Sequence, residues 1–134
     1  MEKSANEGFQ AAIVPTLSVR NGAAAIDFYK EAFGAVELMR VASPDGLVVA
    51  EMSIDGAHFF LADESPEYGN FSPESVGGVT IRIGLFVSDP DAVAARAVAA
   101  GAKEIYPVAD QDYGYRLGCV ADPFGHVWEI ARKL

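Results

Sequence analysis

The stretch DPFGHVWEI at 122–130 has a weaker copy, DGAHFFL at 55–61, that lies 67 to 69 positions before it. A second pair, TLSV at 16–19 and GLFV at 84–87, is separated by 68 positions. The two pairs follow one another in the same order in each half of the chain. A repeat with only two copies is too short for a solenoid and indicates two similar halves that pack on each other.

The first half predicts one strand, one helix and then three strands. Residues 13–19 alternate and are rich in β-branched side chains, as strands are. Residues 23–33 carry an apolar stripe with helical spacing, and Gly34 follows where a helix commonly ends in the left-handed conformation. Turn residues separate three further predicted strands, which cover 36–41, 47–54 and 57–61.

The second half repeats this order, with Asp89 and Pro90 typical of a helix start and Gly101 of its end. Between the halves, 63–78 (DESPEYGNFSPESVGG) has no periodicity and predicts a linker on the surface. We therefore expect a single α+β domain over 1–134, with sheets that curl around a shared cleft. Its parts are a module at 11–62, the linker at 63–78 and a module at 79–132.

Composition excludes several classes of partner. The 134 residues include 19 acidic and 10 basic side chains, for a net charge of -9, so no nucleic acid or membrane partner is expected. The single cysteine, Cys119, cannot form an internal disulfide, which fits a reducing compartment. No apolar run is long enough to span a bilayer, and the N-terminus lacks a signal-peptide core. These features predict a cytoplasmic protein.

The order of these motifs resembles the glyoxalase, bleomycin resistance protein and dioxygenase group, called the vicinal oxygen chelate superfamily. The resemblance lies in Phe28-Tyr29, Phe33-Gly34 and the ending 122–130, and it covers nearly the whole chain from Ile13. Stretches at 28–35, 99–102 and 110–116 are similar to its PhnB-like branch. The resemblance implies two βαβββ modules forming a cupped mixed-sheet pseudo-barrel, a homodimer, and a divalent metal held in the cup.

The family's metal ligands come from the first and last strands of both modules. Carried across to this chain, those positions are Val14, Phe60, Arg82 and Glu129. Only Glu129 has a suitable donor atom, because valine and phenylalanine have none and a guanidinium stays protonated. One carboxylate would hold a hard cation weakly. We therefore expect no cofactor, with a divalent metal bound through unusual ligands as the alternative.

Several residues are candidates for catalysis or ligand binding. Arg82 and Glu129 form either a structural ion pair or a site in which the guanidinium binds an anionic ligand. Glu51 and His58 are candidate general bases, beside Glu129, that point into the first cup; a histidine in a half-buried strand is the alternative for His58. The residues expected to contact a ligand are Arg82, Glu129, Phe60, Thr16, Tyr113, Tyr115 and Arg116.

The last three of these residues surround Gly114 in a segment that could hold a planar or anionic ligand, or could be a plain hairpin loop. The sequence thus predicts a small-molecule binding protein of this fold without the family's metal, with an anionic or aromatic ligand. A metal-dependent lyase, isomerase or dioxygenase is the alternative, and a dimer with a vestigial cavity is a third. Whether the protein is an enzyme, and whether one chain or two complete the cup, stays open.

Overall fold

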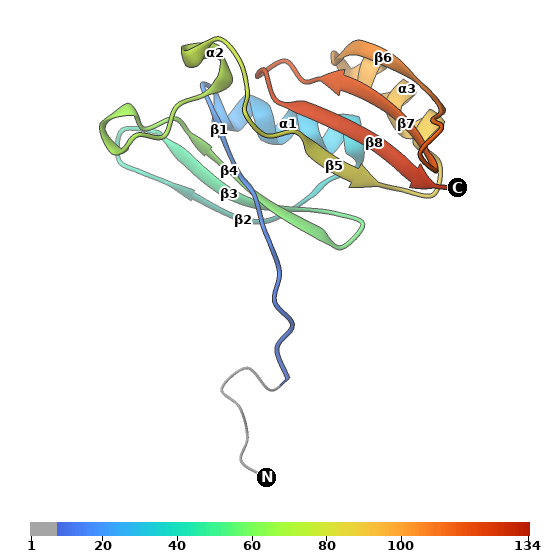
Figure 1. Cartoon of the computed structure of the whole chain (residues 1–134). Helices are drawn as coiled ribbons and strands as arrows, with labels where there is room; N and C mark the ends of the chain where they lie inside the picture. Colours follow the sequence, from blue (N-terminus) through green and yellow to red (C-terminus); the bar gives the residue numbers. More distant parts are fainter. Residues whose placement is uncertain (1–7) are drawn as a thin grey trace.

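The computed structural model describes residues 8–134, which form two four-stranded mixed sheets (Figure 1). In the first sheet the strand order is β1-β4-β3-β2, and in the second it is β5-β8-β7-β6. The first module consists of β1 (Thr16–Val19), α1 (Gly22–Phe33), β2 (Val36–Ala42), β3 (Val48–Ile54) and β4 (Ala57–Asp63). The second consists of β5 (Ile83–Phe86), α3 (Pro90–Ala100), β6 (Lys103–Asp110), β7 (Tyr115–Ala121) and β8 (Val127–Lys133).

The two sheets repeat the same pairing. In each, the first and last strands of the module run parallel and the other pairs run antiparallel. Thr16 lies opposite Phe60 in the first sheet, and Gly84 lies opposite Glu129 in the second. The predicted pair of βαβββ modules is confirmed, and the sequence repeat is a structural repeat.

The helix ends follow the predicted signals. At the start of α1 the Asn21 side chain accepts a hydrogen bond from the Ala24 N–H at 3.1 Å, and Asp89 does the same for Ala92 in α3 at 3.2 Å. Gly34 ends α1 with a φ of 65°, where glycine has no steric penalty. No helix within residues 8–134 is long and apolar enough to cross a membrane.

The predicted strand at 13–19 begins only at Thr16. Pro15 has no N–H to donate, although its carbonyl accepts from the Phe60 N–H at 2.9 Å. Upstream of it the chain leaves the sheet as an extended segment (Figure 1), in which Ile13 is fully exposed. Val14 therefore lies just before β1 and not within it. In the second module, Arg82 likewise lies just before β5, which begins at Ile83.

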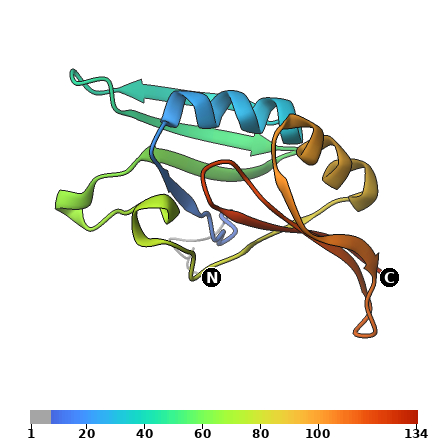
Figure 2. The ribbon, with the colours of Figure 1, turned by 90° about the horizontal axis from the view of Figure 1, so that it is seen from above.

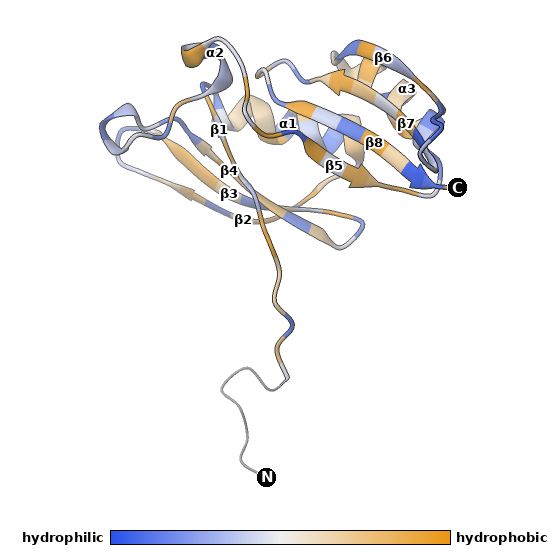
Figure 3. Ribbon diagram, in the orientation of Figure 1, coloured by the Kyte–Doolittle hydropathy of each residue, from blue (hydrophilic) through white to orange (hydrophobic). Residues whose placement is uncertain are grey.

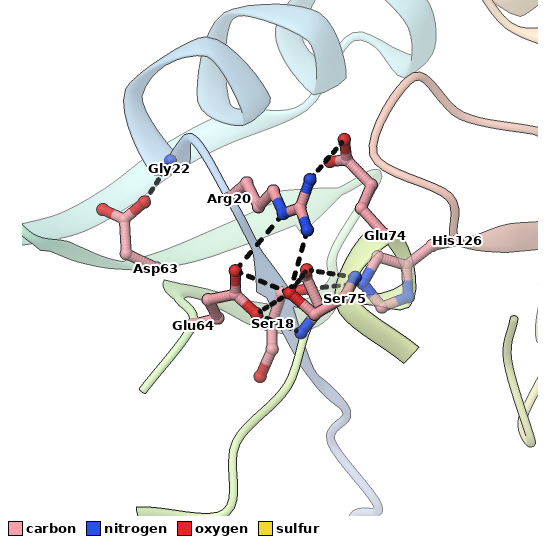
Figure 4. Close-up of polar contacts among 9 residues, drawn as sticks. Ser18, Arg20, Gly22, Asp63, Glu64, Glu74, Ser75 and His126 are labelled. Atoms are coloured by element: carbon pink, nitrogen blue, oxygen red, sulfur yellow. Dashed lines mark hydrogen bonds and ion pairs between the residues drawn. The ribbon is translucent and has the colours of Figure 1, made fainter. Parts of the chain in front are cut away.

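The segment 63–78 is more ordered than a surface loop. It contains a 3-10 turn, η1 (Pro66–Tyr68), and a short helix, α2 (Pro73–Val76). The Glu64 carboxylate accepts from the Ser75 hydroxyl at 2.7 Å and lies 3.4 Å from the Arg20 guanidinium, so the linker is tied to the end of β1 (Figure 4). Ser72 is fully buried and caps α2 by accepting from the Ser75 N–H.

The core joins the two modules through their helices. Figure 2 shows that α1 and α3 meet near the end of α1, and the aromatic rings of Tyr29 and Phe33 from α1 pack against Trp128 of β8. At the centre the Asp122 carboxylate accepts from the Tyr29 hydroxyl at 2.5 Å and from the Trp128 indole N–H at 2.9 Å. Burial, followed by the charge of Asp122, raises the pKa of Tyr29 well above its usual value, so the phenol remains a donor.

Candidate functional site

Each sheet packs against the helices on one face and leaves the other, which we call its open face, without a helix. Burial alternates at the start of β8: Trp128 and Ile130 are buried, and Glu129 between them points to the open face. Figure 3 shows that this strand carries both hydrophobic and hydrophilic residues. Strand register then places one row of four residues across each open face. The rows are Thr16, Phe60, Glu51 and Met39 in the first sheet, and Gly84, Glu129, Cys119 and Tyr106 in the second.

The Glu129 carboxylate is held from two sides. One oxygen accepts from Arg82 Nε at 3.1 Å, and the other accepts from the Tyr106 hydroxyl at 3.2 Å. The Arg82 side chain remains 67% exposed while that of Glu129 is 25% exposed. The guanidinium therefore neutralises the carboxylate and still presents donor groups to solvent.

Tyr106 is a site residue that sequence reasoning missed. Burial, helped by Cys119 and Glu129, raises the pKa of Tyr106 to about 12, so its hydroxyl keeps the proton that it donates to Glu129. The alternation along β6 gives no clear signal, because the strand pairing shifts register between Tyr106 and Ala109, around Pro107. Only the register of the folded sheet places Tyr106 in the row with Glu129.

Cys119 lies between Tyr106 and Glu129 in this row and is 3% exposed. Burial, followed by the nearby charge of Glu129, raises the pKa of the Cys119 thiol. Because the thiolate is the form that binds metals and attacks electrophiles, Cys119 is a packing residue at neutral pH. It fills the position that Glu51 occupies in the first sheet.

The donor atoms at the family's metal positions do not fit a divalent cation. Of Val14, Phe60, Arg82 and Glu129, only Glu129 offers a lone pair, and Arg82 already pairs with it. Phe60 lies on the open face of the first sheet and Glu129 on that of the second. In the part of the chain that the structure describes, no three His, Cys, Asp or Glu side chains form a group that could bind a metal ion.

Glu51 and His58, the other two candidate general bases, are neighbours on the first sheet. His58 Nδ1 lies 2.9 Å from a Glu51 carboxylate oxygen, across the β3–β4 pair. Both side chains line a groove of about 580 Å³ between the first sheet and β5, bounded by the extended segment before β1. Neither Arg82 nor Glu129 lines this groove, so the predicted candidates separate into two places.

A smaller pocket of about 280 Å³ lies between β1, the linker and the segment before β5. Thr16, Thr80 and His126 contribute its polar lining beside Phe71 and Pro73. His126 Nε2 is 2.8 Å from the Ser18 carbonyl oxygen, so this histidine ties the β7–β8 turn to β1. Thr16 and His126 therefore line the same pocket, and Arg82 is not among the residues that line it.

The hairpin between β6 and β7 carries the remaining candidates. The Tyr113 and Tyr115 rings are 6.2 Å apart at its tip, and Tyr115 also contacts Phe86 edge to face. The Arg116 guanidinium is paired with Asp91 at 2.7 Å and with Asp110 at 3.0 Å, and these carboxylates raise its pKa. These three side chains line neither of the two pockets.

Comparison with known proteins identifies the family. The sequence profile of the Glyoxalase/Bleomycin resistance protein/Dioxygenase superfamily matches residues 12–130. The chain belongs to this superfamily, as the resemblance of its motifs predicted.

Individual relatives agree with this assignment. The uncharacterized protein Mb0911c of Mycobacterium bovis is 44% identical over 129 residues, which cover 93% of this chain and 85% of that protein. TioX from Micromonospora sp. ML1 has a similar structure, with a TM-score of 0.70 and 26% identity over 92% of this chain and 97% of that chain. The fosfomycin resistance protein FosX from Listeria monocytogenes, in complex with Mn(II) and sulfate, shares the fold at a TM-score of 0.69 and 15% identity, with 94% of each chain covered.

Proposed function

We propose that this protein binds a small anionic molecule at the open face of the second sheet, and that it does so without the divalent metal of its superfamily. The observation that carries the proposal is the occupation of the Glu129 carboxylate by Arg82 and Tyr106. A cation at this carboxylate would have to displace a guanidinium, and within residues 8–134 no group of three His, Cys, Asp or Glu side chains completes a metal site there. Arginine thus takes the place of the metal as the local positive charge.

The exposed Arg82 guanidinium defines the ligand class. A planar guanidinium offers a fork of N–H donors that matches a carboxylate or phosphonate in two-point contact. Within residues 8–134, the hydrogen bond from Arg82 to Glu129 uses the Nε atom of the guanidinium. The two terminal nitrogens of Arg82 can therefore bind a ligand. The exposed ring of Tyr106, whose hydroxyl donates to Glu129, adds surface for an aromatic or aliphatic part of the ligand.

We also propose that the protein is a homodimer. β1 and β5 are edge strands, and apolar side chains beside them are exposed, with Ile81 at 72% and Phe86 at 63% exposure. Unpaired strand edges with apolar neighbours favour pairing with another chain, and two-fold homodimers are the commonest assembly. The buried thiol of Cys119 fits a reducing location such as the cytoplasm.

Thermal shift with a panel of small carboxylates and phosphonates tests the binding proposal. At least one member is expected to raise the melting temperature of the wild-type protein, since a ligand that binds the native state stabilises it by mass action. Arg82→Ala is expected to abolish this shift. The control is Arg40→Ala, which breaks an exposed pair of the same kind, with Glu37 at 2.9 Å on the first sheet, and should retain the shift.

The proposal is wrong if no member of the panel binds, or if the shift survives in Arg82→Ala. A ligand that stabilises the wild type only after a divalent metal is added would instead support the metal-dependent lyase, isomerase or dioxygenase. For the dimer, sedimentation analysis should give twice the chain mass, and Ile81→Asp should yield the monomer because it buries a charge in the contact.

A further inference from the structure

A second site lies in the groove between the first sheet and β5. Its fourteen lining residues include two titratable side chains, Glu51 and His58, and the rest are apolar residues or glycine. Phe59, Leu85 and Trp128, all at least 93% buried, form its inner wall. A groove of about 580 Å³ has the size of a site for a small organic molecule, and its lining is mostly apolar with one polar pair, as such sites usually are.

Strand register places Glu51 and His58 next to each other. On the β3–β4 hairpin, Glu51 lies opposite Phe60 and His58 lies opposite Ser53, so the two side chains are diagonal neighbours on one face. The 2.9 Å contact between His58 Nδ1 and Glu51 requires a proton on Nδ1, because an ionised carboxylate only accepts hydrogen bonds. In a neutral imidazole the Nε2 atom is then the acceptor.

Within residues 8–134, the imidazole ring of His58 makes one hydrogen bond, to Glu51 through Nδ1. Its Nε2 atom therefore keeps a lone pair that can accept a proton. The His58 side chain is 46% exposed and that of Glu51 is 29% exposed, so a molecule in the groove can reach the ring. A carboxylate that orients a histidine and selects its tautomer is the arrangement that lets imidazole act as a general base.

We propose that His58, positioned by Glu51, is a general base for proton removal from a small, largely apolar molecule bound in this groove. The reaction class is deprotonation of a weak carbon or oxygen acid, with the proton taken by Nε2 and later released to solvent. This activity goes beyond binding at Arg82, which lines no part of the groove. The two proposals therefore stand or fall separately.

A purely structural cross-strand pair is the competing explanation, and a probe reaction distinguishes the two. 5-Nitrobenzisoxazole is planar and mostly apolar, and a base opens its ring in one step. The base removes the proton on carbon 3, the C–H electron pair completes the nitrile, and the N–O bond breaks to leave a coloured phenolate. No metal, cofactor or second reactant is needed.

The wild-type protein is expected to accelerate this reaction about 10²-fold over free imidazole at the same concentration, a typical contribution of a positioned base. His58→Asn should return the rate to background, and Glu51→Ala should lower it about tenfold. His126→Asn, which changes the other histidine of the chain, is the matched control and should keep the wild-type rate. Circular dichroism melting confirms that each variant is folded.

A second readout addresses the positioning role of Glu51. Nitrogen NMR of the neutral ring should show His58 protonated on Nδ1 in the wild type, and a shift toward protonation on Nε2 in Glu51→Ala. The proposal is overturned if the wild type is no faster than imidazole, if His58→Asn keeps the rate, or if the tautomer is unchanged by loss of Glu51.

Discussion

The open faces of the two sheets occupy equivalent places in a repeated fold, yet they carry different chemistry. Phe60 in the first sheet and Glu129 in the second hold the same register position, as do Glu51 and Cys119. The first sheet keeps a carboxylate and an imidazole beside an apolar groove, and the second keeps a carboxylate neutralised by an arginine. The backbone plan and the buried faces are common to both modules, whereas the chemistry of the open faces has diverged.

This difference shows which positions the fold requires. Residues on the helix side, such as Leu17, Val19 and Ile130, are at most 4% exposed and are set by packing. Residues on the open side are free to change without loss of the core. The shared fold therefore does not by itself decide which functional side chains stand on its open faces.

The largest expected effect concerns the contact that holds the two modules in place. Asp122 accepts from Tyr29 and Trp128, and also from the Phe124 and His126 backbone N–H groups at 2.9 and 3.0 Å. Asp122→Ala would leave these donors unpaired in the core, at a cost of about 3–5 kcal/mol in free energy of unfolding. Urea denaturation measures it, with Tyr29→Phe, which removes one donor, as a control expected to lose about 1 kcal/mol. A loss below 1 kcal/mol in Asp122→Ala would show that the modules are held together mainly by apolar contacts.

A smaller effect is expected where the second sheet departs from the first. At Gly118 an added Cβ would lie 2.7 Å from the Val108 backbone nitrogen, next to the register shift in β6. Gly118→Ala should therefore cost about 2 kcal/mol, since backbone must move to accept it. The control is Gly78→Ala, because an added Cβ on Gly78 has nothing within 4 Å. Gly56 is equally open but has a positive φ, so alanine would be strained there. Equal stability of Gly118→Ala and Gly78→Ala would contradict the close approach of β6 to β7.

The smallest effect is a change in stability at alkaline pH that arises from the second sheet. Tyr106 has a pKa of about 12 in the native protein, against about 10 in an unfolded chain, so folding favours its protonated form. Its contribution to stability is fully present below pH 10 and is lost as the pH rises through about 12. Absorbance titration of the phenolates should show one fewer late-titrating tyrosine in Tyr106→Phe than in the wild type. A late phase unchanged by this substitution would mean that Tyr106 is not held against Glu129.

Much of this fold could be predicted from the sequence, because the repeat, Asn21, Gly34 and Asp89 are local signals. The start of β1 could not, since it depends on which neighbour pairs with residues 13–15. The order in the linker was also missed: α2 is only four residues long and is held by Arg20, Glu64 and the β7–β8 turn, where an added Cβ on Gly125 would lie 2.7 Å from Pro73. These contacts are distant in sequence and leave no periodic pattern.

The candidate site was predicted in part for the same reason. The pairing of Arg82 with Glu129 follows from adjacent strands, and alternation puts Glu51 and His58 on one face. Tyr106 was missed because a register shift hides its direction, and the grouping of Tyr113, Tyr115 and Arg116 with a ligand site stays a prediction. Alternation assigns the face of a strand, but only three-dimensional pairing shows which faces meet.

The central claim is that an arginine has replaced the metal at Glu129, and metal titration tests it most directly. Purified protein, stripped of metal and then titrated with Mn²⁺, Ni²⁺ and Zn²⁺ by calorimetry, should show no binding tighter than millimolar, and Glu129→Gln should give the same result as the wild type. Elemental analysis of the protein as purified should find no stoichiometric metal. One equivalent of Mn, Ni, Zn or Fe per chain, bound tightly and lost in Glu129→Gln, would contradict the account.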